Sequence, residues 1–259
     1  LYKMAMDQIY LDNNATTPML PEVVEVINEA HRAGYANPAS QHQSGQQARR
    51  VLEDARERIT ELLGGQTSGL KPDRLVLTSG GTESNNLALR GLTAEPQDAN
   101  IVVSSIEHPS VLDTALHLER SGVEIRYLPV NRDGVVDLEK LDDFVDERTR
   151  LVSVMLGNHE TGVCQPVEEI ASIARERQAL VHCDAVQAVG KINVDFRALN
   201  VDALSISAHK LHGPVGIGGL LLRHDMAPRP IMTGGFQQQG SRPGTEPVAL
   251  TLGFREALE

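Results

Sequence analysis

The sequence predicts an α/β protein built on a mostly parallel, mixed sheet of about seven strands that is flanked by helices. Short apolar runs of strand length alternate with amphipathic stretches of helical spacing along the chain of 259 residues. Strands that are separated by helices indicate a largely parallel sheet covered on both faces. Several polar motifs come directly after the apolar runs, and in such sheets the carboxyl ends of the strands form the ligand site.

The individual elements follow in order from this alternation. The expected strands are residues 75–77, 101–104, 123–128, 151–156, 180–183, 203–206 and 219–222. The expected helices are residues 21–32, 46–63, 83–91, 110–120, 138–146, 167–177 and 247–258.

Charge and composition exclude several classes of partner. The net charge is −11, and such an acidic surface repels phosphate backbones and anionic lipids, so we expect no direct nucleic acid and no membrane as partner. Aromatic residues make up only 3% and Trp is absent, which leaves no stacking platform for single-stranded nucleic acid. No apolar run reaches the roughly 18 residues of a membrane span. Two cysteines form no disulfide framework, which favours a cytoplasmic location.

The most informative residues are Lys210, at the end of an apolar, serine-rich run, and Asp184, at the end of another. Desolvation disfavours the ammonium of a lysine at a buried strand end and lowers its pKa. The resulting amine can form a Schiff base with an aldehyde such as that of pyridoxal phosphate (PLP). A carboxylate at the depth of Asp184 is costly unless it is paired, and the protonated pyridine nitrogen of PLP would pair it. The two residues therefore predict a PLP site.

A phosphate cradle is predicted where a strand meets a helix at Gly80-Gly81-Thr82. Glycines let the backbone approach a ligand, the N–H groups of the helix start bind an anion, and Thr82 adds a hydroxyl. Ser207 and His209 alternate onto one face and can both reach a phosphate. A plain glycine turn capped by Thr82 is the alternative, and a Walker loop is excluded because no Gly-Lys-Ser/Thr follows.

Other polar residues follow strands at positions that suit a planar cofactor. His108, held by Pro109 at the first turn of a helix, can stack on such a ring or shuttle protons, although a surface role at a helix start is the alternative. Asn158 and His159 could bind a ring oxygen or a substrate carboxylate, or form a plain polar turn. Gln187 could donate a hydrogen bond to the phenolic oxygen of the cofactor.

A metal centre is not expected from the run His182-Cys183-Asp184. Adjacent residues of a strand point to opposite faces of the sheet, so these three side chains cannot converge on one ion. Cys183 is instead interpreted as a core residue, and Cys164, in a loop before Pro166, as incidental.

Taken in order along the chain, these motifs resemble those of the cysteine desulfurases of the NifS/IscS type. This group belongs to the class V aminotransferase family of fold-type I PLP enzymes. The resemblance covers nearly the whole chain, and the set of motifs is specific although each member is weak. The matching segments are residues 11–18, 37–40, 78–85, 107–108, 158–162, 184–187, 207–210 and 242–245.

The resemblance implies the large domain of a fold-type I enzyme and a role for each matching residue. Lys210 would form the Schiff base, and His108 would stack on the ring and take part in acid–base steps. Asp184 would pair with the pyridine nitrogen, Gln187 with the ring oxygen, and Thr245 would reach the phosphate of the other subunit of a homodimer. The phosphate of the same subunit would be held by Gly81, Thr82, Ser207 and His209.

The implied reaction converts L-cysteine to L-alanine and leaves a persulfide on an enzyme cysteine, from which sulfur passes to an acceptor or scaffold protein for iron–sulfur clusters or tRNA thiolation. Two departures affect this reading. His159 stands where the family has a second Asn, and an imidazole is larger and titratable. Neither Cys164 nor Cys183 matches the persulfide cysteine, which the family carries, with a substrate-binding arginine, in a small C-terminal domain.

The expected domain organisation follows from this resemblance. Residues 1–20 form an N-terminal segment, residues 21–245 the PLP-binding large domain, and residues 246–259 the start of a helix that leads to the small domain. The helical pattern reaches Glu259 without a cap, so we expect a piece of a longer product. Three alternatives remain. The first is another class V enzyme, such as a selenocysteine lyase or an aminotransferase, and the second is a short scaffold form without catalysis. The third is a nicotinamide dehydrogenase, which is disfavoured because no Gly-x-Gly-x-x-Gly motif follows the first predicted strand.

Overall fold

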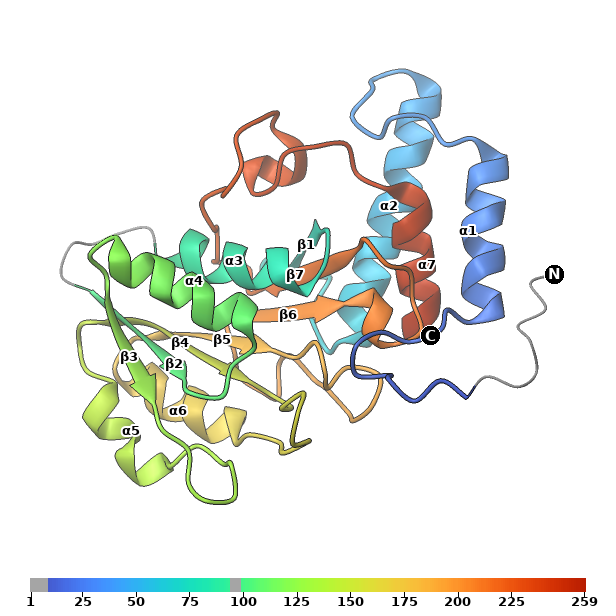
Figure 1. The fold of residues 1–259 in the computed structure, drawn as a ribbon. Coiled ribbons are helices and arrows are strands. Elements are labelled where there is room, and N and C mark those ends of the chain that lie inside the picture. The colour runs from blue at the N-terminus through green and yellow to red at the C-terminus, as the bar shows by residue number, and fades with distance from the viewer. Residues whose placement is uncertain (1–8, 94–98) are drawn as a thin grey trace.

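A seven-stranded mixed sheet forms the centre of the protein, as the sequence predicts (Figure 1). The computed structural model describes residues 9–93 and 99–259. The strands lie in the order β1-β7-β6-β5-β4-β2-β3, and only β7 runs antiparallel to its two neighbours. The strands are β1 (Arg74–Thr78), β2 (Asn100–Ser104), β3 (Glu124–Leu128), β4 (Thr149–Met155), β5 (Leu180–Asp184), β6 (Ala203–Ser207) and β7 (Gly218–Leu222).

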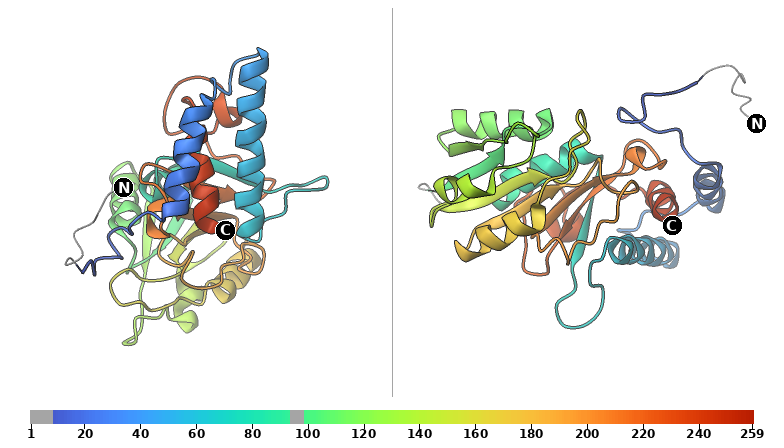
Figure 2. Two further views of the ribbon diagram at one scale, coloured as in Figure 1. Left: turned by 90° about the vertical axis from the view of Figure 1, so that its right-hand side faces the viewer. Right: turned by 90° about the horizontal axis from the view of Figure 1, so that it is seen from below.

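Helices cover both faces of this sheet and one of its ends (Figures 1 and 2). Helices α3 and α4 lie on one face, α5 and α6 on the other, and α1, α2 and α7 stand together beyond β1 and β7. The helices are α1 (Pro21–Ala33), α2 (Gln43–Leu62), α3 (Gly81–Leu92), α4 (Pro109–Arg120), α5 (Leu138–Phe144), α6 (Val167–Glu176) and α7 (Val248–Leu258), with short 3₁₀ turns η1 (Ala208–Lys210) and η2 (Gln237–Gly240).

Alternation along the strands divides the core into two apolar clusters. On β5, Val181 and Cys183 are fully buried in the cluster that also contains α2, α5, α6 and α7. Their neighbours His182 and Asp184 point to the other face, beneath α3 and α4. Cys183 is therefore a core residue, as expected, and the face beneath α3 receives the polar side chains of the strands.

The edge strand β1 is capped by a side chain instead of a further strand. Gln238 of η2 accepts a hydrogen bond from the backbone N–H of Leu77 at 2.7 Å and donates one to the Leu77 carbonyl at 2.8 Å. Arg56 of α2 also donates to Gln238 Oε1, at 2.9 Å. The carboxamide thus occupies backbone groups that an exposed edge would leave unpaired, and it fastens the loop before α7 to the sheet.

The helix α7 packs against α1 and α2. That it leads to a further domain stays a prediction. Phe254 is fully buried, and a Cβ at Gly253 would lie 2.6 Å from Ile27 of α1, which shows how closely the two helices approach. Residues 1–8 of the expected N-terminal segment lie outside the described residues.

Most predicted boundaries lie within a few residues of the observed ones, and the differences have local causes. Helix α2 begins three residues earlier than predicted, because His42 caps it by accepting a hydrogen bond from the N–H of Gly45 at 3.2 Å. Ser207 and His209 were expected to alternate onto one face as in a strand, but residues 208–210 form the turn η1, in which the Leu211 N–H bonds to the Ala208 carbonyl at 3.1 Å.

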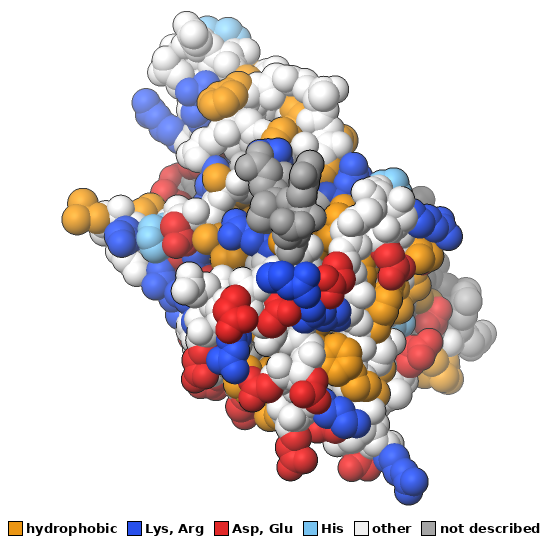
Figure 3. Space-filling model, turned by 90° about the vertical axis from the view of Figure 1, so that its left-hand side faces the viewer, with side chains coloured by type: hydrophobic (Ala, Val, Ile, Leu, Met, Phe, Trp, Pro, Cys, Tyr) orange, Lys and Arg blue, Asp and Glu red, His pale blue; other side chains and the backbone are white. Residues whose placement is uncertain are grey.

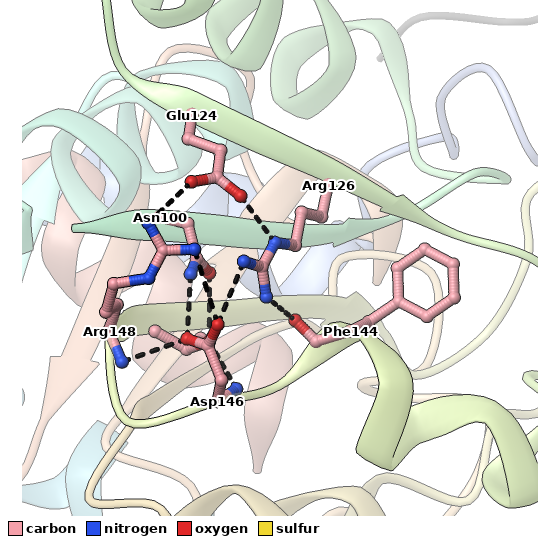
Figure 4. Close-up of polar contacts among 7 residues, drawn as sticks. Asn100, Glu124, Arg126, Phe144, Asp146 and Arg148 are labelled. Atoms are coloured by element: carbon pink, nitrogen blue, oxygen red, sulfur yellow. Dashed lines mark hydrogen bonds and ion pairs between the residues drawn. The ribbon is translucent and has the colours of Figure 1, made fainter. Parts of the chain in front are cut away.

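A network of paired charges lies at the amino-terminal ends of β2, β3 and β4 (Figure 4). Arg126 donates to Glu124 at 2.7 Å and to Asp146 at 2.9 Å, and Arg148 lies 3.1 Å from Glu124. Asn100 donates to Asp146 at 3.0 Å. Acidic and basic side chains intermingle over this side of the molecule (Figure 3). Within residues 9–93 and 99–259, no helix is long and apolar enough to cross a membrane.

Candidate active site

A pocket opens where β4, β5 and β6 end and α3 begins, at the carboxyl edge that the sequence pattern indicated. Nine of the eleven residues predicted for the site line it. These nine are Gly81, Thr82, His108, His159, Asp184, Gln187, Ser207, His209 and Lys210. Five further residues line it as well: Asn85, Ser110, Met155, Gly157 and Val186.

Lys210 brings an amine to this pocket from the last position of η1. Partial burial is the main reason why the pKa of Lys210 is lowered, and the nearby carboxylates of Asp12 and Asp184 only partly oppose that effect. The Nζ atom donates to two backbone carbonyls, those of Asn14 and, at 2.8 Å, Ala15. An amine with a lowered pKa and neutral partners is poised to act as a nucleophile.

The two carbonyls belong to an N-terminal strap, residues 12–18, that lies along the pocket. Thr17 fastens the strap by donating to the His209 carbonyl at 2.9 Å and accepting from the His212 N–H at 2.6 Å. Asn14 donates to the His159 carbonyl at 3.1 Å, and its own carbonyl accepts from Gln187 at 2.8 Å. The strap therefore ties together the segments that carry His159, Gln187 and Lys210.

Asp184 places a buried carboxylate in the same pocket, with only 5% of the residue exposed. Its Oδ1 accepts from the Val186 N–H at 2.9 Å, and its Oδ2 accepts from Asn85 at 2.6 Å. Burial raises the pKa of Asp184, and these two hydrogen bonds offset only part of the effect. The described residues provide Asp184 with no ion pair, so a cationic group of a ligand would be strongly favoured here.

His108 and His159 bring two imidazoles to the pocket from different elements. His108 caps α4, and its Nδ1 accepts from the Ser110 N–H at 3.1 Å. The two rings meet edge to face, with centroids 5.3 Å apart and planes at 69°. Burial lowers the pKa of His108, and the charge of Asp184 opposes this. The effect of burial is the larger of the two, so His108 is kept neutral and able to stack on a planar ring.

The N-terminus of α3 forms a cradle that suits a phosphate. Gly80 adopts a φ of 153°, and a Cβ at Gly81 would lie 2.7 Å from Val186, so both positions favour glycine. The first N–H groups of a helix have no partner within it and attract an anion. Ser207 is 1% exposed, and its Oγ has no hydrogen-bond partner although it lines the pocket. His209 is held by Thr16, at 3.1 Å.

These observations fit PLP in particular. The pocket combines an amine of lowered pKa, a buried carboxylate without a cation, and an anion cradle, which match the aldehyde, pyridine nitrogen and phosphate of that cofactor. Buried polar atoms of three lining residues also lack partners: Ser207 Oγ, Asn85 Oδ1 and His159 Nδ1. Unpaired buried polar atoms are costly, so a polar ligand that pairs them explains why they gather here.

Two predicted residues do not line this pocket. Asn158 lies behind it, where its Oδ1 accepts from the backbone N–H groups of Glu160 and Thr161 at 3.0 and 2.9 Å. It shapes the turn that carries His159. Thr245 is exposed near α1 and α7, so its contact with the phosphate of another subunit stays a prediction.

Sequence reasoning gave no role to Asn85, Ser110 and Glu107. Asn85 lies four residues after Gly81 on α3, and this helical spacing, which puts both on one face, was the available signal. Glu107 lies beneath the pocket, where its Oε1 accepts from Ser104 at 2.5 Å and from the Met155 N–H at 2.7 Å. Burial raises the pKa of Glu107 to about 8, which keeps this carboxyl protonated near neutral pH.

Fold and pocket together define the class: an α/β domain of the fold-type I kind with a PLP site at the carboxyl ends of its strands. The chain belongs to the class V aminotransferase family, whose model matches residues 9–259, and this family is PLP-dependent.

Its relatives include cysteine desulfurases. A cysteine desulfurase of Trichormus azollae is 44% identical over 255 residues, and cysteine desulfurase IscS of Dictyoglomus turgidum is 41% identical over 254 residues. Each alignment covers nearly all of this chain, 98% and 97%, but only 62% and 63% of the relative. The chain therefore spans about three fifths of the length of these curated relatives.

Solved structures agree with this assignment. A NifS-like protein superposes with a TM-score of 0.91 at 40% identity, covering 97% of this chain and 68% of the other. A structure of SspA in complex with cysteine superposes with a TM-score of 0.90 at 34% identity, covering 97% of this chain and 72% of the other. The predicted family and fold class are thus confirmed.

Proposed function

We propose that this chain is the cofactor-binding portion of a PLP-dependent cysteine desulfurase. The reaction removes the sulfur of L-cysteine, releases L-alanine, and leaves the sulfur on an enzyme cysteine as a persulfide. The observation that carries the proposal is that Lys210 and Asp184, two titratable groups with pKa values shifted by burial, face one pocket whose other walls suit a phosphate. Relatives named cysteine desulfurase and a neighbour that holds cysteine support the choice of substrate.

Each part of the cofactor has a matching group in the pocket. Lys210 would hold it covalently, Asp184 would pair with its ring nitrogen, and His108 would stack on the ring. Gln187 would reach the ring oxygen, with His159 beside it. Gly81, Thr82, Ser207 and His209 would hold the phosphate. Bound PLP supplies an electron sink that weakens bonds of the attached amino acid.

The residues of this chain would control where protons are held. Lys210, once released from the cofactor, is an amine of lowered pKa that can take a proton from the substrate. His108 is the second group able to exchange protons, because burial lowers its pKa and keeps it neutral near pH 7. The carbonyls of Asn14 and Ala15 in the strap accept hydrogen bonds from Lys210 and hold its amine at the pocket.

The persulfide is assigned to a cysteine outside residues 1–259. Cys183 is fully buried on the sheet face away from the pocket, and burial raises the pKa of its thiol, which makes it a poor nucleophile. Cys164 is exposed but does not line the pocket. A small C-terminal domain of the whole protein would supply the sulfur-accepting thiol, and a separate acceptor or scaffold protein would receive the sulfur.

A homodimer in the cytoplasm completes the proposal. Thr245 is exposed and lies away from the pocket of its own chain, as suits a residue that reaches the phosphate of a second subunit. The neighbouring Arg242 donates to Glu83 of α3 at 2.8 Å, which ties the loop that carries Thr245 to the helix of the cradle. Two unpaired cysteines suit a reducing compartment.

The test is cofactor loading followed by product analysis of the whole protein that contains this chain. After addition of PLP we expect an absorbance band at about 400–430 nm, from the lysine-bound cofactor, that Lys210→Ala abolishes. Incubation with L-cysteine should yield alanine and sulfide in equal amounts when a thiol reductant is present. Absence of the band would overturn the cofactor assignment. Alanine from selenocysteine alone, or amino transfer to a 2-oxo acid without sulfide, would replace cysteine desulfuration by one of the related reactions.

A further inference from the structure

A chain of hydrogen bonds through Asn85 and Ser110 connects the carboxylate of Asp184 to the imidazole of His108. Asn85 of α3 donates through Nδ2 to Asp184 Oδ2 at 2.6 Å and to Ser110 Oγ at 2.8 Å. Ser110 Oγ in turn lies 2.8 Å from Nδ1 of His108. Asn85 is 1% exposed, Ser110 8% and Asp184 5%, so water does not compete for these bonds. The carboxylate of β5 and the imidazole at the start of α4 are thereby joined across α3.

The hydrogen atoms of this network can be assigned by counting donors. A carboxylate only accepts, so one Nδ2 hydrogen of Asn85 goes to Asp184 and the other to Ser110 Oγ. Because Ser110 Oγ accepts from Asn85, its own hydrogen is free to be donated, and the neighbouring acceptor is His108 Nδ1. The Ser110 backbone N–H also donates to this nitrogen, at 3.1 Å. Two donors therefore point at Nδ1, which must carry a lone pair.

We propose that Asn85 and Ser110 are positioning residues that hold His108 as the neutral tautomer with its proton on Nε2 and align it with Asp184. If the proposed function holds, which this consequence requires, every proton that His108 gives or takes during the reaction passes through Nε2. Asn85 serves both ends of the network, since the same carboxamide orients the carboxylate that would pair with the ring nitrogen of the cofactor. Neither residue was assigned a role from the sequence.

Four titratable groups, from β5, η1, the turn after β4 and α4, act on the pKa of His108. Asp184 comes from β5, Lys210 from η1, His159 from the turn after β4, and Asp113 from α4 itself. Burial is the main reason why the pKa of His108 is lowered, while Asp184 and Asp113 raise it and His159 and Lys210 lower it. The two donors at Nδ1 act in the same direction as burial, because a protonated Nδ1 would have to face them.

The experiment reads the tautomer directly, before any cofactor is bound. The whole protein, stripped of PLP and labelled with ¹⁵N-histidine, is compared with its His108→Gln variant to assign the signals of His108. Long-range ¹H–¹⁵N spectra at a pH above the His108 titration should show protonated Nε2 and unprotonated Nδ1. In Ser110→Ala we expect a mixture of both tautomers and a rise in the pKa of His108. Ser110→Thr, which keeps the hydroxyl, should restore the original pattern.

A matched control separates the network from general effects on α4. Thr114 lies one turn after Ser110 and is also buried, and among the described residues its hydroxyl donates to the Ser110 carbonyl alone, at 2.8 Å. Thr114→Val removes this hydroxyl without touching Nδ1, so the His108 signals should stay unchanged. Asn85→Ala should shift His108 in the same direction as Ser110→Ala and also raise the pKa of Asp184, which ¹³C spectra of labelled aspartate report.

The outcomes distinguish this inference from the proposed function. An Nδ1-protonated His108 in the unaltered protein, or an unchanged tautomer in both Ser110→Ala and Asn85→Ala, overturns the network even if PLP binds and cysteine is desulfurated. Failure of PLP to bind overturns the proposed function and leaves the tautomer result standing. In the loaded enzyme, Ser110→Ala should lower kcat by about 3- to 10-fold with little change in KM, and it should move the pH profile upward.

Discussion

Charged side chains are paired with one another at the amino ends of the strands and are not paired at the carboxyl ends. At the amino ends, Arg126 and Arg148 are paired with Glu124 and Asp146, and Asn100 completes the set (Figure 4). Burial would raise the pKa of Asp146, but hydrogen bonds from Arg126 and Asn100 outweigh it and hold that pKa well below its ordinary value. Each charge of this cluster meets an opposite charge of the protein itself.

At the carboxyl ends, the charged groups have no ion-pair partner among the described residues, and some polar atoms have no hydrogen-bond partner. Asp184 has no cation among the described residues, Lys210 meets only carbonyls in hydrogen bonds, and Ser207 Oγ and His159 Nδ1 are buried and unpaired. Unpaired buried groups lower stability, and here they gather at the carboxyl ends of the strands and not at the amino ends. This distribution indicates a ligand site at the carboxyl ends. Perturbed pKa values alone would not separate the two sites, because Asp146 is also shifted; the unpaired atoms separate them.

The largest expected effect is that of removing the amine. Lys210→Ala should abolish the absorbance of lysine-bound PLP and lower kcat on L-cysteine by on the order of 10³-fold or more, because no other amine lines the pocket among the described residues. Lys140→Ala, at a surface lysine near Asp137, is the matched control and should change neither. Retention of the absorbance band in Lys210→Ala would move the covalent attachment to another residue.

Removing the buried carboxylate should have effects of opposite sign on cofactor binding and stability. Asp184→Asn keeps the shape but should weaken PLP binding and lower kcat by about 10²- to 10³-fold, since the ring nitrogen loses its counter-charge. The unloaded variant should be more stable at pH 7. Burial raises the pKa of Asp184 above its unfolded value, so the ionised group costs stability once the pH exceeds the unfolded value. Thermal unfolding with and without PLP measures both, and equal shifts in the two states would contradict the comparison.

Glu107 should make the stability of the unloaded protein depend on pH. Burial raises its pKa from the ordinary 4.5 to about 8, so the folded protein keeps a proton that the unfolded chain has lost. The free energy of unfolding should therefore fall as pH rises from about 5 to 8, by up to about 1.4 kcal/mol per pH unit from this group. Glu107→Gln should remove this slope, and urea unfolding at pH 5.5 and 8 checks it. A slope equal to that of the unaltered protein would mean that Glu107 ionises normally.

The smallest effect is expected at the paired end of the sheet. Asp146→Asn should cost about 1 kcal/mol or less of stability near pH 7, since half-exposed ion pairs are screened by solvent, and it should leave PLP binding unchanged. The lowered pKa of Asp146 adds stability above the pKa of the unfolded carboxyl, and this contribution is lost as pH falls through the folded pKa. The variant and the parent should thus converge in strong acid. A loss of PLP binding in Asp146→Asn would show that the two ends are coupled.

Much of the fold and the site could be predicted from the sequence because both depend on local patterns. The strand runs, the helix spacing and the glycine pair at 80–81 lie within short windows. Nine of the eleven residues predicted for the site line one pocket. Predicted helix boundaries were wrong where a capping side chain outside the amphipathic pattern sets the end of the helix, as His42 does at the start of α2. The turn η1 was missed because the alternation of Ser207 and His209 was interpreted as extended backbone beyond the predicted strand.

By itself, the sequence determined the class of sheet, the edge at which polar residues gather, and the chemistry those residues can perform, since alternation and residue type are properties of neighbours along the chain. Only the tertiary structure decided that Asn14 faces Lys210, that Gln238 caps β1, and that Asn85 joins Asp184 to Ser110. These contacts join residues from about 25 to nearly 200 positions apart, and their geometry follows from how helices and loops pack on the sheet. No local pattern encodes that packing.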